Sequence, residues 1–218
     1  MPTNIVKPNK IGMLKEYYEM LTQKARTKDA ERFANADRAH NVVVMRVMLE
    51  NAKSIKMYCG ELSIFRKEFA DKVNDSIEWD DELVNDFDLM KGLYSALALF
   101  LEKGNTFEAI IENPSDLEKE DIYKYILKKY IDKGQVYLYT FQNNYEKTPN
   151  AFHFLLGNDH MYRRENNHYE RSAICCFNSE TGTEILSWQY DAYKQHIIPI
   201  SLAAAPLHTP TPPPPPRH

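Results

Sequence analysis

The sequence has 218 residues, 43% hydrophobic and 27% charged, which is long enough for one domain with a substantial buried core. A net charge of −4 argues against a broadly basic surface of the kind that binds nucleic acid. No apolar run reaches the ~20 residues of a membrane span, and the N-terminus lacks the apolar core of a signal peptide. These features favour a cytoplasmic protein without a membrane partner.

The first 53 residues have a helical pattern that is interrupted once. Apolar residues recur at three- and four-residue steps from Ile11 to Leu21, and the polar stretch TKDAERFANADRAHN then breaks this face. The pattern resumes as VVVMRVMLENAKS, whose apolar residues cannot share one face, so this helix is expected to be buried on more than one side. We interpret residues 1–53 as an N-terminal helical extension.

From residue 54 onward, strands and helices alternate. Strands are expected in SIKMYC, NTFEAIIENP and QVYLYTF, and then in the closely spaced AFHFLL, HMYRRE and SAICCF. Helices are expected at 62–73, 79–103, 115–132 and 183–196. Strands separated by helices indicate an α/β fold with a mixed, largely parallel sheet flanked by helices, which we assign to residues 54–200.

The last segment, SLAAAPLHTPTPPPPPRH at 201–218, has no periodicity and contains a proline run. We interpret it as a disordered tail that derives from a cloning vector. The alternative is a native ligand for a proline-binding domain.

The chain has three cysteines, Cys59, Cys175 and Cys176, which cannot all pair with one another. Cys175 and Cys176 are adjacent and would point to opposite faces of a strand. We therefore predict reduced thiols packed in strands, as is usual in the cytosol. A reactive thiol is the alternative, but the sequence places no helix N-terminus or basic partner beside any of them.

The order of elements resembles one half of the phospholipase D-like fold. The resemblance depends on a strand with His153, a turn with Asp159, and the pair Phe177-Asn178 before the last helix. Members of that superfamily carry the motif His-x-Lys-x-x-x-x-Asp. Its histidine forms a covalent phosphohistidine, its lysine holds the phosphate and its aspartate orients an imidazole. The resemblance therefore implies a catalytic role for His153 and Asp159, and a ligand-binding role for Asn178.

The motif is degenerate in this chain. Leu155 stands at the lysine position, and His160 stands at the aspartate position with Asp159 one residue early. Arg163 and Arg164 leave opposite faces of the following strand, so one of them would replace the lysine if it faces the cleft. The alternative for both arginines is a surface ion pair.

Other candidate residues are chosen by position. Glu61 and Glu112 follow the first two strands, at the carboxyl ends where ligands bind in α/β proteins. Asp159, His160 and His168 would suit a metal, but their spacing matches no established pattern, so we predict neither a metal nor a cofactor. The alternative for His153 is a partly buried histidine bonded to a carbonyl or a carboxylate.

Three functions remain open from the sequence. The first is a catalytically degenerate phospholipase D-like protein that acts as a binding or interaction module; the resemblance points to bacterial nucleic-acid handling or defence. Single-copy members build one site across a twofold interface, so we expect a homodimer, and we also consider a protein partner. The alternatives are an active phosphodiesterase or nuclease that uses His153 from two subunits, and a small-ligand sensor near Glu61 and Glu112.

Overall fold

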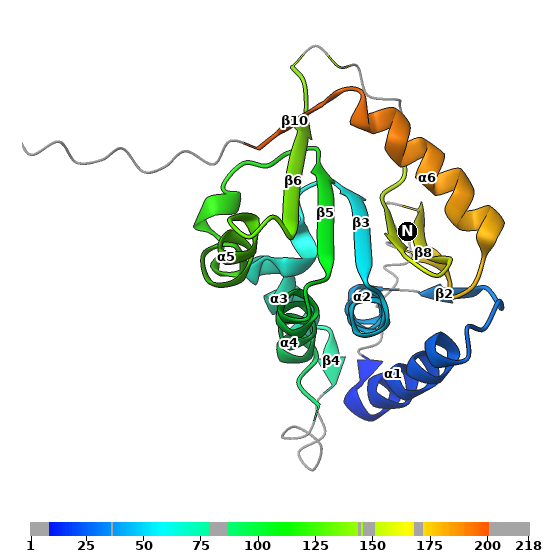
Figure 1. The fold of residues 1–218 in the computed structure, drawn as a ribbon. Coiled ribbons are helices and arrows are strands. Elements are labelled where there is room, and N and C mark those ends of the chain that lie inside the picture. The colour runs from blue at the N-terminus through cyan, green and yellow to red at the C-terminus, as the bar shows by residue number, and fades with distance from the viewer. Residues whose placement is uncertain are drawn as a thin grey trace, which may run out of the picture.

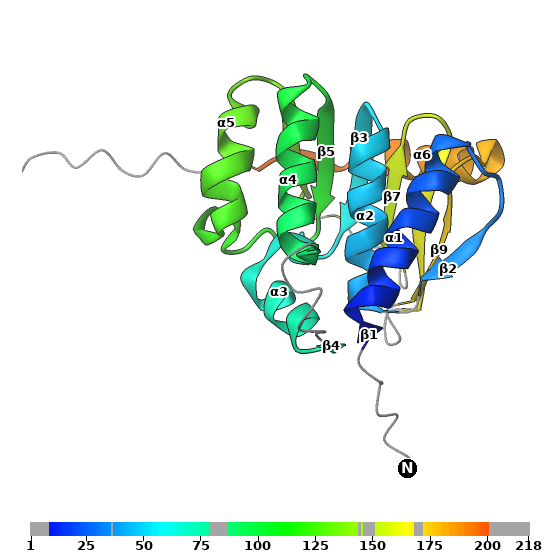
Figure 2. The same cartoon turned by 90° about the horizontal axis from the view of Figure 1, so that it is seen from below.

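A computed structural model describes residues 9–35, 37–78, 87–143, 145, 151–167 and 172–200. These residues form an eight-stranded sheet in the order β10-β6-β5-β3-β7-β8-β9-β2. Helices α1 to α5 cover one face of the sheet and α6 covers the other (Figures 1 and 2). The expected α/β architecture of a mixed sheet between helices is therefore confirmed.

The strands of this sheet lie close to the positions that hydrophobic alternation predicts. Their bounds in chain order are β2 Phe33–Asn35, β3 Ser54–Cys59, β5 Thr106–Ile111, β6 Val136–Phe141, β7 Phe154–Gly157, β8 Met161–Asn167, β9 Ser172–Cys176 and β10 Ile197–Pro199. A separate pair joins β1 (Asn9–Lys10) to β4 (Ile77–Glu78). Four strands were not expected from the sequence, β1, β2, β4 and β10, because two or three residues are too few to show alternation.

The sheet is less parallel than the sequence predicts. Within the described sheet, β3 and β5 pair in parallel, as do β5 and β6, and the other neighbours are antiparallel. Parallel neighbours need a long crossover, which the helices between β3, β5 and β6 provide. The short connection from β7 to β8 closes an antiparallel hairpin instead.

Six α-helices are described: α1 Ile11–Arg26, α2 Arg38–Asn51, α3 Lys67–Asn74, α4 Leu89–Glu102, α5 Lys128–Ile131 and α6 Glu180–Lys194. A 3₁₀ turn (Ser63–Phe65) precedes α3, and a 3₁₀ turn (Leu117–Lys119) and a π-helix (Tyr123–Leu127) precede α5. Helix α6 begins three residues earlier than expected, because the Ser179 side chain caps it by accepting a hydrogen bond from the Gly182 N–H. The first residues of the helix expected at 79–103 and the tail at 201–218 lie outside the described residues.

The N-terminal helices pack into the same hydrophobic core as the sheet. Helix α2 is buried on several sides, as predicted, and strand β2 adds an edge to the sheet beside β9. Residues expected to form an extension therefore contribute directly to the sheet and, through α2, to the pocket described below.

All three cysteines are buried and unpaired. Burial raises the pKa of the Cys59 and Cys175 thiols to about 12, because it removes the thiolate from water. The prediction that the cysteines are packed in strands is confirmed.

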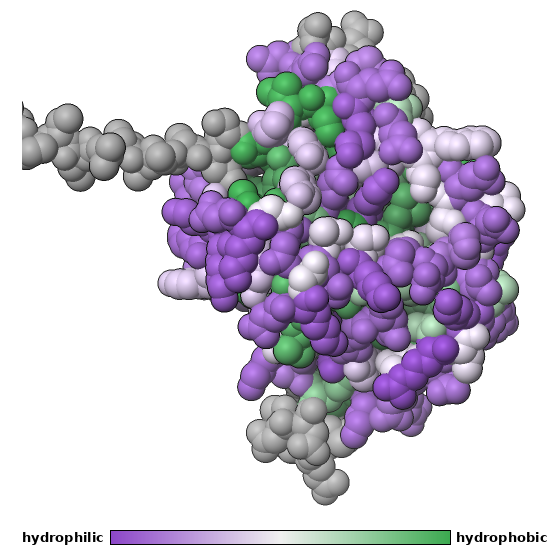
Figure 3. All heavy atoms as spheres, in the orientation of Figure 1, coloured by the Kyte–Doolittle hydropathy of each residue, from purple (hydrophilic) through white to green (hydrophobic). Residues whose placement is uncertain are grey.

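The molecular face in Figure 3 is mainly hydrophilic. Hydrophobic side chains gather near β10 on this face, where Ile198 is exposed. None of the described helices has the length and apolar character needed to cross a membrane.

Candidate functional site: a pocket at the carboxyl ends of β3 and β5

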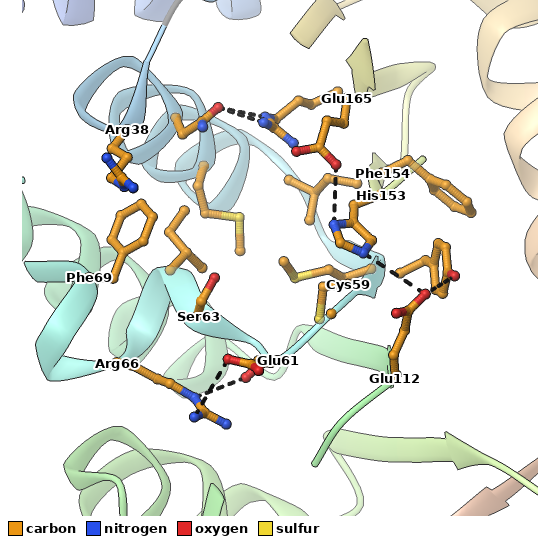
Figure 4. A pocket seen from close by; sticks show the side chains of 18 of the residues that line it. Arg38, Cys59, Glu61, Ser63, Arg66, Phe69, Glu112, His153, Phe154 and Glu165 are labelled. Carbon is orange, nitrogen blue, oxygen red and sulfur yellow. Dashed lines mark hydrogen bonds and ion pairs between the residues drawn. The ribbon is translucent and has the colours of Figure 1, made fainter. Parts of the chain in front are cut away.

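A pocket of about 490 Å³ lies where the parallel strands β3 and β5 end. Its walls come from α2, the loop after β3, α3, the end of β5 and the open end of the β7–β8 hairpin (Figure 4). The carboxyl ends of neighbouring parallel strands are where α/β proteins commonly bind ligands. Of the residues predicted from the sequence, the structure brings Glu61, Glu112, His153 and Arg163 together here.

His153 lies between two carboxylates. Its Nδ1 atom is 3.2 Å from Glu165 Oε2, and its Nε2 atom is 4.0 Å from Glu112 Oε1 (Figure 4). The loop approaches closely here: a Cβ atom on Gly60 would lie 3.3 Å from His153 Cε1, so a larger residue would press on the imidazole. The ring is thus held in the pocket with both nitrogens facing acceptors.

Sheet register explains the pairing of His153 with Glu165. The Glu165 N–H donates to the His153 carbonyl at 2.8 Å, which extends the ladder in which Phe154 pairs with Arg164. Residues opposite each other in a ladder project to the same face, so the imidazole and the Glu165 carboxylate meet. Glu165 is therefore the carboxylate that faces Nδ1 of His153.

Glu112 is fixed from the opposite face of the sheet. The hydroxyl of the buried Tyr58 donates a hydrogen bond to Glu112 Oε1. Burial raises the pKa of Tyr58, and this hydrogen bond to a carboxylate raises it further, so the hydroxyl keeps its proton. The Tyr58 ring also meets the His153 ring edge-on at 5.5 Å.

Arg163 reaches the pocket from strand β8. It pairs with Leu155 across the β7–β8 ladder, so both side chains leave the sheet on the pocket face. Its Nε and Nη2 atoms donate to the side-chain oxygen of Asn41 in α2, at 2.9 and 2.6 Å, and the Asn35 amide donates to the same oxygen. Burial lowers the pKa of Arg163, because the charged guanidinium has lost water.

Three predicted site residues lie elsewhere. Arg164 leaves the opposite face of β8, where its guanidinium lies 5.2 Å from the Phe152 ring centroid. Asp159 lies in the turn after β7, at the other end of the hairpin from His153, and forms an exposed ion pair with Lys28 at 3.5 Å. Asn178 belongs to that end too, because the next residue, Ser179, donates its N–H to the His160 carbonyl.

The rim of the pocket carries Glu61, which is about half exposed. Arg66 donates to the Glu61 carbonyl at 3.1 Å and to the Ser115 carbonyl at 3.0 Å, and its Nη1 lies 3.8 Å from the Glu61 carboxylate. These bonds tie the loops after β3 and β5 together. They also position Glu61 at the pocket mouth.

Several pocket residues were not predicted from the sequence, among them Glu165, the partner of His153, and Arg38 and Asn41 of α2. Arg38 and Asn41 stand three residues apart on one helix face, more than 100 residues before His153. The available signal was a polar asparagine beside the apolar run VVV, which is unusual for a helix buried on several sides.

No metal site is evident in the part of the chain that the structure describes, since no group of three or more His, Cys, Asp or Glu side chains could hold an ion. His160 Nδ1 lies 3.4 Å from the Thr183 hydroxyl. His168 lies outside the described residues.

No protein-family model and no curated protein matches the sequence. Among solved structures, the chain is similar to TrmBL2, an archaeal chromatin protein with a novel mode of DNA binding, with a TM-score of 0.49 and 11% identity. The match covers 86% of this chain but only 62% of that one. The chain is also similar to Nuc, a phospholipase D family member from Salmonella typhimurium, with a TM-score of 0.46, 12% identity, and coverage of 78% of this chain and 98% of that one.

Proposed function

We propose that the protein is a binding module that holds the phosphate group of a ligand at Arg163 and does not hydrolyse it. The observation that carries this proposal is the Leu155–Arg163 pair. The lysine of the motif is missing, and an arginine stands across the ladder from it on the pocket face. Arginine is well suited to phosphate because its planar fork of N–H donors matches two phosphate oxygens.

The surroundings of Arg163 support an anionic ligand. Its described hydrogen-bond acceptor is the neutral amide oxygen of Asn41, and no described ion pair within 4.0 Å involves its guanidinium. Glu165 is near enough to favour the charged form of Arg163, but its carboxylate is directed at His153. A desolvated guanidinium with a neutral partner gains from an incoming anion.

The same geometry argues against hydrolysis. Glu112 Oε1 lies 4.0 Å from His153 Nε2. A phosphate that approached this nitrogen would meet a carboxylate, which repels it. We therefore place the anion at Arg163 and away from the imidazole.

A thermal melt with inorganic phosphate tests this binding. A ligand that binds the folded state alone raises the melting temperature as its concentration rises. We expect phosphate to raise the melting temperature of the wild type and of Arg164→Gln, the matched arginine on the other face of β8. Arg163→Gln should melt at a temperature independent of phosphate. An equal shift in all three proteins would refute the proposal.

A second candidate is a phosphodiesterase or nuclease, which the His153–Glu165 contact favours. If Nδ1–H donates to Glu165, Nε2 carries the lone pair that a nucleophile or base needs. Two subunits of a homodimer would then supply two such histidines, one to attack phosphorus and one to protonate the leaving group. The carboxylate of Glu112 beside Nε2 is the reason that we place this function second.

Hydrolysis of bis(4-nitrophenyl) phosphate separates the two candidates. The binding module predicts no release of nitrophenolate above the buffer rate by the wild type. Release by the wild type that disappears in His153→Ala, together with a dimer in light scattering, would establish the second candidate. Release that persists in His153→Ala would contradict the prediction of no turnover and would also exclude His153 as the source of the activity.

A further inference from the structure

The pocket has arginine side chains on its α2 side and the carboxylate of Glu112 at the end of β5. Arg38 lies at one side, near Phe69, and Glu112 and His153 lie at the opposite side (Figure 4). Arg163 is anchored to Asn41, one helical turn after Arg38 on α2. A ligand that used the whole pocket would therefore have an anionic end toward α2 and a different end toward Glu112.

An apolar surface also belongs to this pocket. It is formed by Met45 of α2, Met57 of β3, Ile64 and Leu155, all of which line the pocket. Met45 and Leu155 are almost fully buried, and the other two pack against the same core. Such a surface does not stabilise a free phosphate ion, but it favours a ligand in which an apolar ring is attached to the phosphate.

The side of the pocket at Glu112 should favour a ligand group that donates a hydrogen bond. An ionised carboxylate can only accept, and its two oxygens accept several hydrogen bonds, so Glu112 can serve a ligand in addition to Tyr58. A ligand carbonyl at this place would meet negative charge, whereas an amino group would donate to it. Discrimination between amino and keto groups is therefore expected at Glu112.

From these three features we infer that the pocket binds a nucleoside monophosphate whose base carries an amino group. The phosphate lies at Arg163 and Arg38, the base crosses the apolar surface, and the amino group donates to Glu112. The volume of about 490 Å³ is in the range of small-molecule sites. This inference rests on the proposed function, because Arg163 must hold the phosphate.

Calorimetric titration of the full chain with four probes tests the inference: AMP, IMP, adenosine and inorganic phosphate. AMP should bind at least about tenfold more tightly than adenosine or phosphate, because only AMP engages both ends of the pocket. IMP has a keto oxygen in place of the amino group and should bind about tenfold more weakly than AMP. In Glu112→Gln, whose amide both donates and accepts, the ratio of the AMP and IMP affinities should fall to within about twofold.

The failures of the inference and of the proposed function are distinguishable. Phosphate binding that needs Arg163, with AMP binding no more tightly than phosphate, would overturn the inference and leave the proposed function. Equal affinities for AMP and IMP in the wild type would also overturn the inference. If neither phosphate nor AMP binds the folded wild type, the inference and the proposed function are both overturned. An affinity for AMP that is unchanged in Arg163→Gln would also overturn both.

Discussion

The two ends of the β7–β8 hairpin carry similar residue types but differ in structure. At the open end, His153 faces Glu165 and Leu155 faces Arg163, and these residues line a pocket. At the turn, Asp159 has a positive φ of 59° and an exposed side chain. Register across the ladder, rather than spacing along one strand, therefore brings polar groups together in this hairpin.

Removal of the Asn41 amide should produce the largest effect on stability. Asn41→Ala leaves the desolvated guanidinium of Arg163 without its acceptor, and we expect the free energy of unfolding to fall by about 3 kcal/mol. Asn178→Ala, at the turn end, should change it by less than about 0.5 kcal/mol. Urea unfolding of both variants measures these changes in the free energy of unfolding. Equal losses in the two variants would contradict the claim that the two ends of the hairpin differ.

A double variant tests whether Asn41 acts on stability through Arg163. Replacement of both Asn41 and Arg163 by apolar residues, as in Asn41→Leu with Arg163→Met, leaves no unpaired buried charge. We expect the double variant to lose less stability than Asn41→Leu alone in the same urea unfolding experiment. A loss equal to the sum of the two single losses would show that the two side chains act independently.

The buried thiols should make the free energy of unfolding depend on pH in the alkaline range. The pKa of Cys59, at the pocket, is about 12 in the folded state and ~8.5 in an unfolded chain. Between these values the unfolded state has lost a proton that the folded state keeps. Stability must therefore fall as pH rises from about 9 to 12, by up to ~1.4 kcal/mol per pH unit for each such thiol. The slope should be smaller in Cys59→Ala, and an unchanged slope in urea unfolding across this range would contradict the burial of this thiol.

The smallest expected effects are changes in the NMR resonances of His153, which should distinguish Glu165 from Asp159 as its partner. Glu165→Gln should move the imidazole proton resonances of His153, because its carboxylate lies 3.2 Å from Nδ1. Asp159→Asn keeps a residue that tolerates positive φ and loses only an exposed ion pair with Lys28, worth ~0–1 kcal/mol. It should leave the His153 resonances in place. Movement in both variants, observed by proton NMR, would show that the turn acts on the pocket.

The sequence predicted the parts of this molecule that depend on local pattern. Alternation located the longer strands, and the rule that ligands bind at the carboxyl ends of strands selected Glu61 and Glu112, both of which line the pocket. The sequence left Arg163 and Arg164 equivalent, because only the register with β7 shows which of them faces α2.

Other features depend on contacts that no local pattern contains. Asn41 reaches Arg163 through packing between residues 122 positions apart. The sequence predicted more parallel pairing than the sheet contains. The pairing of β7 with β3, of β9 with β8 and of β2 with β9 is antiparallel, and it depends on tertiary contacts that the local pattern does not show. Asp159 was considered because the motif is linear, whereas the hairpin places it at the end away from His153.

Phosphorus-31 NMR of bis(4-nitrophenyl) phosphate is the decisive measurement, because one spectrum reports both binding and hydrolysis. The diester resonance should broaden with the wild type and with Arg164→Gln, stay sharp with Arg163→Gln, and give no monoester resonance over time. A growing monoester resonance that depends on His153 would contradict the claim that the ligand is held without turnover. Equal broadening with Arg163→Gln would contradict the claim that Arg163 holds the phosphate.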